Sequence, residues 1–154
     1  MYPHNHFFFG LIFSLVLFII FPQIGLIESV IILLANFFVD VDHYLYYVYK
    51  KKDYNLKNAY NWFVKANKKI LELPKEKRKH FYSCFCFLHG IEPILFLFVL
   101  GFFLNKYFFF LGIGISFHLI CDIYYEQVLY KTRIHKLSII YDYFRYNKLK
   151  FFDI

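Results

Sequence analysis

Long apolar runs alternate with short polar segments along this chain, and the alternation predicts its helices. Each of four runs is predominantly apolar and is followed by turn-forming or charged residues. Apolar runs of roughly 20 residues are typical of helices that cross a lipid bilayer. The sequence therefore predicts an all-α membrane bundle in one domain, with spans at residues 7–21, 26–47, 81–104 and 107–125.

The polar connection at residues 50–80 shows a different pattern. Its apolar residues recur at steps of three and four, which is the spacing of one helix face. The residues of that face are Leu56, Tyr60, Phe63, Ala66, Ile70 and Leu73. Asn55 suits the N-cap of this helix and Pro74 its end. Because lysines fill the other side, we expect a basic amphipathic helix, lying either on an anionic leaflet or on the domain itself.

Basic residues are distributed unevenly along the chain. Residues 1–49 contain no Lys or Arg, residues 50–80 contain eleven, and residues 81–130 contain only Lys106. An excess of Lys and Arg marks the cytoplasmic loops of membrane proteins. We therefore expect the connection and the tail at residues 126–154 in the cytoplasm, with both termini, at a cell or inner membrane. The same rule accounts for the net charge of +7, so it disfavours nucleic-acid binding as the explanation.

The composition supports a lipid environment. The chain is 60% hydrophobic, with 23 Phe and 15 Tyr among 154 residues, which is more than a soluble domain of this size can bury. The first six residues lack Lys and Arg, so we expect the first run to be retained rather than removed as a signal peptide. The three cysteines, Cys84, Cys86 and Cys121, are odd in number and lie in apolar runs, which argues against a disulfide framework. They are either small apolar fillers or metal-binding or redox thiols.

Histidines and acids gather near the expected cytoplasmic ends of the four spans. Their side chains are ligands that zinc and similar divalent ions take. The candidate metal ligands are His6, Asp40, Asp42, His43, His89, Glu92, His118 and Asp122. Pairs within this set are spaced by three or four residues, so each such pair shares a helix face. Since ionisable groups inside a span are costly when they face lipid, we expect a metal site here, the alternative being a polar network that joins the helices.

The order of these residues resembles that of a known family. The chain contains, in order, His6-x-x-x-Gly10, Asp40-x-Asp42-His43, His89 and His118-x-x-x-Asp122, over residues 4 to 125. This ordered set is similar to that of the predicted membrane-bound metal-dependent hydrolases. Those are small multi-span proteins, related more distantly to the zinc-dependent phospholipase C and single-strand nuclease fold.

The resemblance implies metal-assisted hydrolysis of a phosphoester by two or three zinc ions at the inner membrane face. Asp42 lies off the Asp40–His43 helix face by roughly 200°, so we expect it to orient the attacking water. The position of the site favours a lipid-linked substrate. Two other classes stay open: a small ion transporter, because buried His and acids also mark ion paths, and a non-catalytic metal-binding membrane adaptor. The sequence leaves the oligomeric state open.

Overall fold

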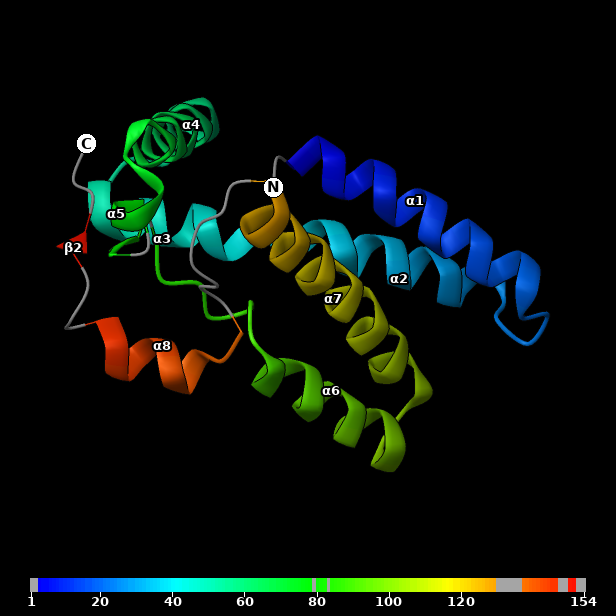
Figure 1. Ribbon diagram of the computed structural model, residues 1–154. Coiled ribbons are helices and arrows are strands. Elements are labelled where there is room, and N and C mark those ends of the chain that lie inside the picture. Colours follow the sequence, from blue (N-terminus) through cyan, green and yellow to red (C-terminus); the bar gives the residue numbers. More distant parts are fainter. Residues whose placement is uncertain (1–2, 79, 83, 130–136, 147–149, 152–154) are drawn as a thin grey trace.

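The chain folds into helices joined by short connections (Figure 1). The computed structural model describes residues 3–78, 80–82, 84–129, 137–146 and 150–151. The described helices are α1 (Pro3–Ile20), α2 (Leu26–Phe38), α3 (Val41–Lys51), α4 (Leu56–Glu72), α5 (Lys75–Arg78), α6 (Ile91–Phe103), α7 (Lys106–Tyr124), the π-helical turn η1 (Tyr125–Leu129) and α8 (Ile139–Tyr146). The described strands are β1 (Phe81–Tyr82) and β2 (Lys150–Phe151), which pair in parallel. Apart from this short pairing, the helical prediction is confirmed.

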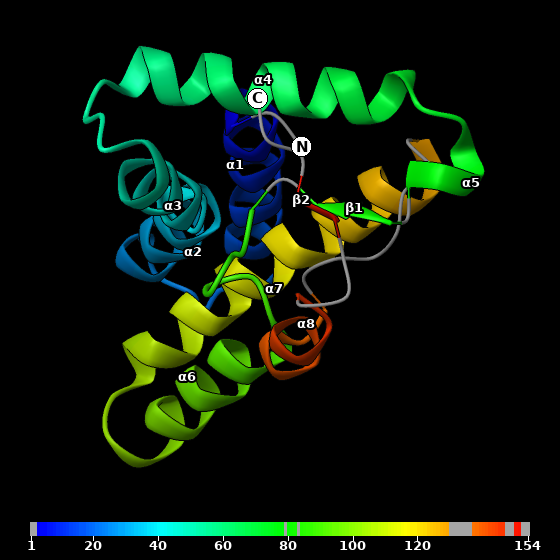
Figure 2. The same cartoon turned by 90° about the vertical axis from the view of Figure 1, so that its left-hand side faces the viewer.

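The apolar helices lie side by side in the order α1, α2, α7, α6 (Figure 1). Buried residues from α2, the residue that follows it, α6 and α7 form their common core. These residues are Ala35, Val39, Ile94, Ile115 and Leu119. Figure 2 shows α4 lying across the end of this group where α1 begins. The side chains of the candidate site come from that same end of the helices.

Two helical stretches among the described residues are long and apolar enough to cross a membrane, by length and composition. They are Pro3–Ile20 and Lys106–Val128. α2 and α6 are apolar but have only 13 residues each. The structure therefore supplies two helices that are long and apolar enough to be spans, and the four-span arrangement stays a prediction.

The predicted span at residues 26–47 is divided at Val39 and Asp40. Here the backbone N–H groups of Asp42 and His43 bond to carbonyls three residues back, at 3.4 and 3.1 Å. This tighter turn separates α2 from α3. It changes the rotation of the side chains that follow, so helix spacing alone could not place Asp42.

The predicted span at residues 81–104 begins ten residues later than expected. Residues 84–90 are not helical, and α6 starts at Ile91. Pro93 is the third residue of this helix, a position where its missing N–H costs nothing because the first helical N–H groups have no partner within the helix. The prediction that His89 lies inside a helical span is therefore wrong.

α4 confirms the predicted helix in the basic connection, and its N-cap. The Asn55 side chain accepts hydrogen bonds from the second and third backbone N–H groups that follow it. Of the predicted apolar face, Ala66 and Ile70 are buried whereas Leu56 and Tyr60 are exposed. Trp62 packs on Tyr47 of α3. The Tyr47 hydroxyl also donates to Asp53 at 2.6 Å, and this hydrogen bond holds the pKa of the Asp53 carboxyl below its usual range.

Candidate metal centre

The candidate residues meet where four parts of the chain come together. His6 comes from the start of α1, three residues from the α2–α3 junction, one from the non-helical segment before α6, and two from the second half of α7. The candidates in these four parts are His6, Asp40, Asp42, His43, His89, His118 and Asp122. All except Asp40 and His43 are nearly or fully buried. The sequence therefore predicted the right neighbourhood for seven of its eight candidates.

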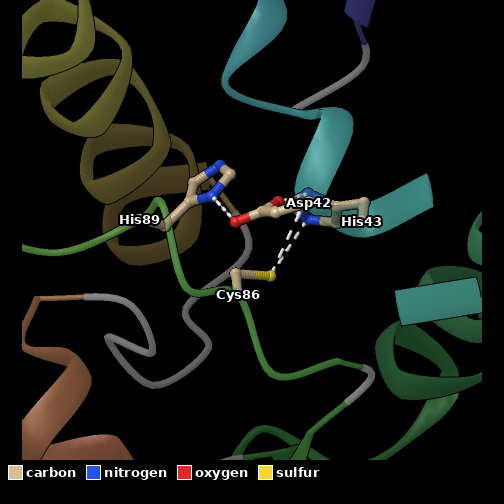
Figure 3. Close-up of side chains that lie close together, drawn as sticks. All are labelled: Asp42, His43, Cys86 and His89. Atoms are coloured by element: carbon tan, nitrogen blue, oxygen red, sulfur yellow. Dashed lines mark hydrogen bonds and ion pairs between the residues drawn. The ribbon is translucent and has the colours of Figure 1, made fainter. Parts of the chain in front are cut away.

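Asp42 lies between two histidines and orients both (Figure 3). One carboxylate oxygen accepts a hydrogen bond from His43 Nδ1 at 2.8 Å. The other accepts from His89 Nδ1 at 2.9 Å and from the backbone N–H of Leu88 at 2.9 Å. A carboxylate that accepts from one ring nitrogen of a histidine leaves the other nitrogen with its lone pair, ready to bind a metal. Asp42 therefore prepares His43 and His89 as ligands.

His118 is prepared in the same way by the backbone of α2. Its Nδ1 lies 2.7 Å from the carbonyl oxygen of Asn36, and a carbonyl can only accept, so Nδ1 carries the proton. The lone pair of His118 is then on Nε2, which lies 2.9 Å from Nε2 of His89. Two lone pairs at this distance repel each other unless a proton or a metal cation lies between them.

Two carboxylate oxygens approach the same pair of nitrogens. Asp40 Oδ1 lies 3.4 Å from His89 Nε2 and 3.6 Å from His118 Nε2. Asp122 Oδ2 lies 3.6 Å from each of these nitrogens. A shared proton can join only one pair of these atoms. A tetrahedral zinc ion with bonds of about 2.0–2.2 Å can join several, and its ligand atoms lie about 3.3–3.6 Å apart. The nitrogen–oxygen distances match this spacing, whereas the 2.9 Å between the two nitrogens is shorter. Asp40, His89 and His118 form one group that could hold a metal ion, and His6, His118 and Asp122 form another.

His6 extends the group on the α1 side. Its ring stacks on that of His118, with ring centroids 3.7 Å apart. Its Nε2 lies 3.1 Å from Asp122 Oδ1, so it can fix the orientation of that carboxylate. Among the described residues, His6 Nδ1 has no hydrogen-bond partner although it is buried. The second oxygen of Asp40 is likewise buried and without a partner in this part of the chain.

Asn36 is a residue that sequence analysis missed. Its side-chain nitrogen donates to the carbonyl oxygen of His6 at 2.6 Å, while its own carbonyl accepts from His118. One residue of α2 thus connects α1 and α7 at the centre. Gly10 lies directly beside this amide, and a Cβ at that position would collide with it. The signal was available, because an amide in an otherwise apolar run needs a buried partner.

Glu92 does not join the other candidates. Its carboxylate accepts hydrogen bonds from the Ser138 hydroxyl at 2.5 Å and from the backbone N–H of Ile139 at 2.9 Å. It therefore caps the start of α8. A second residue that the ligand set lacked is Cys86, whose sulfur lies 3.5 Å from His43 Nε2.

No family model, curated protein or solved structure matches this chain. The likeness to membrane-bound metal-dependent hydrolases accordingly depends on the order of the residues alone. The case for a metal centre comes from the contacts within the structure.

Proposed function

We propose that this protein is a membrane-embedded, metal-dependent hydrolase of phosphoesters. The observation that carries the proposal is the approach of His89 Nε2 and His118 Nε2 to 2.9 Å, with the other nitrogen of each ring already hydrogen-bonded. Asp40 adds an oxygen to these two nitrogens, which makes a group of three that could hold a metal ion and would leave a position for water. Nitrogen and oxygen ligands suit a zinc ion that activates water, whereas closed structural zinc sites are rich in thiolates.

The membrane location is supported by the exposure of the apolar helices. Only 17% of α1 and 28% of an apolar 18-residue stretch within Lys106–Val128 are buried within the protein. The core helix of a soluble protein would be mostly buried. Large apolar side chains such as Ile19 and Phe102 are 75% and 84% exposed. Lipid is the solvent in which this surface is stable.

A bound divalent cation would lower the pKa of a water molecule and polarise a phosphoester oxygen. The surrounding residues would hold the reactants. Asp40 has the most accessible of the three carboxylates, at 18% exposure, and its second oxygen, which is itself buried, has no partner among the described residues. We therefore assign the acceptance of the water proton to Asp40 and keep Asp42, whose oxygens are both engaged, as the residue that positions His43 and His89.

The proposed substrate is a phosphoester that reaches the centre from the membrane. The ligands sit at one end of the apolar helices, where a lipid-linked phosphate group would lie at the bilayer surface. We place this end, α4 and both termini on the cytoplasmic side, because the basic residues of α4 follow the positive-inside pattern.

The test is metal content and hydrolysis measured on the same sample. Full-length protein purified in detergent should contain zinc or another divalent ion and hydrolyse a phosphoester probe in mixed micelles. The variant with His118→Ala and Asp122→Ala should insert in the membrane yet lose at least one ion and the activity. If the metal-loaded protein hydrolyses no mono- or diester from roughly pH 6 to 9, the protein is a metal-binding membrane adaptor rather than an enzyme. Full metal occupancy in the double variant would refute the ligand assignment.

A further inference from the structure

Two cysteines lie next to each other beside the metal centre, in the non-helical segment before α6. The sulfur atoms of Cys84 and Cys86 are 2.8 Å apart. Cys84 is partly exposed, whereas Cys86 is buried, with 7% of its surface exposed. A disulfide bond is about 2.05 Å long, so its formation needs the two sulfurs to approach by less than an ångström.

The short separation favours sulfur–sulfur bonding over a shared metal. Two thiolates on one tetrahedral zinc ion, with bonds of about 2.3 Å, lie roughly 3.7 Å apart. The observed 2.8 Å is well below that distance. The pair is therefore better placed to close than to hold an ion between its sulfurs.

The buried thiol is oriented by the histidine next to it. Cys86 Sγ lies 3.5 Å from His43 Nε2, and Figure 3 shows the sulfur directed at this ring. His43 donates its Nδ1 proton to Asp42, so its Nε2 is an acceptor for the thiol of Cys86. Cys86 is thereby fixed beside Cys84 rather than free to rotate away.

We propose that Cys84 and Cys86 form a redox-active dithiol that closes to an intramolecular disulfide on reaction with a low-molecular-weight disulfide. Cys84 is the more accessible sulfur and attacks first, which gives a mixed disulfide and releases one small thiol. Cys86 then attacks the sulfur of Cys84 and releases the second small thiol. The protein loses two protons and two electrons, which the small disulfide gains as its two sulfurs become thiols.

This site goes beyond the proposed hydrolase, because neither sulfur is among the four atoms that surround the contact between His89 and His118. Cys86 also lies in a group with Asp42, His43 and His89 that could hold a metal ion, and the disulfide chemistry does not require that ion. It is nevertheless connected to that group. The segment that carries both cysteines continues into Leu88 and His89, which bind Asp42. A disulfide would therefore form in the segment that presents His89 to the centre.

The experiment uses the full-length protein in detergent, exposed to oxidised glutathione, quenched with acid and alkylated before mass spectrometry. We expect the peptide containing both cysteines to lose two hydrogens, to carry no alkyl group and to retain no glutathione. Cys121, on α7, serves as the internal reference and should be alkylated as before. In Cys86→Ser, the Cys84–glutathione adduct should persist, whereas the wild-type adduct should be transient.

Two results would overturn the proposal. One is a wild-type Cys84 adduct that lasts as long as the adduct in Cys86→Ser. The other is full alkylation of Cys84 and Cys86 after the oxidant, with Cys121 behaving in the same way. The second result is obtained on the wild-type protein alone, so it holds even if the variant fails to fold.

Discussion

Replacing Asp42 by Asn tests whether this residue positions histidines or acts on water. The carboxylate accepts from His43 Nδ1 through one oxygen and from His89 Nδ1 through the other. An amide has a single oxygen, and its NH2 group would face the N–H of one of the two rings. One charge-assisted hydrogen bond is lost, and a donor is set against a donor. From the sequence alone, the same substitution was expected to spare the metal and abolish only hydrolysis.

The magnitude follows from the lost bond. A hydrogen bond to a charged group contributes about 1.5–3 kcal/mol. Since about 1.4 kcal/mol is a factor of ten, the metal dissociation constant should rise roughly 10- to 100-fold, the range found for residues that orient metal ligands. Titration with a competing chelator on detergent-purified protein measures this constant. Circular dichroism checks that the helices are retained.

Glu92→Gln is the matched control. It makes the same carboxylate-to-amide change in a residue that also accepts several hydrogen bonds, but at the start of α8. The metal dissociation constant of this variant should stay within about twofold of the wild type, well inside the tenfold that 1.4 kcal/mol represents. Unchanged metal affinity in Asp42→Asn, or an equal loss in Glu92→Gln, would refute the positioning role.

Two other predictions concern packing and orientation. Gly114→Ala should destabilise the protein by about 1–3 kcal/mol and lower its melting temperature in detergent, because the new Cβ would meet the backbone oxygen of Ile32 and lie 2.7 Å from the Cβ of Ala35; an unchanged melting temperature would show that α2 and α7 can separate freely. Lys65→Cys, on a background without the native cysteines, should resist a membrane-impermeant maleimide added outside intact cells, because we place α4 in the cytoplasm. Labelling of that residue from outside would reverse the proposed orientation.

The sequence was sufficient to predict the gathering of the candidate ligands. Each of His6, Asp40 and His118 is an ionisable residue in or at the end of an apolar run, and the cost of leaving such a group in an apolar environment is high. Successive apolar helices are expected to run in opposite directions, and this arrangement brings these groups to the same end of the bundle. Helix periodicity was enough for His118 and Asp122, because α7 is regular from Lys106 to Tyr124.

Where the helix geometry changes, residue spacing predicted the site less well. His89 comes from an irregular segment, and no periodic rule applies to residues outside a helix. The predicted span at residues 81–104 included Glu92 and Pro93 in its interior, although an acid and a proline both favour the first turn of a helix. The α2–α3 junction rotated Asp42 toward two histidines, a contact that depends on tertiary structure and leaves no mark in local spacing.

Two side-chain interactions join α2 and α7 at separate points along their length. Near their starts, the Lys106 ammonium donates to Glu28 at 2.7 Å, and further along, His118 donates to the carbonyl of Asn36 at 2.7 Å. These two bonds hold the helices together, and the pair carries or directly precedes Asp40, His118 and Asp122. His89, by contrast, comes from the non-helical segment at residues 84–90. Metal should therefore exchange on the side of this segment, at a rate set by its displacement, while α2 and α7 stay in place.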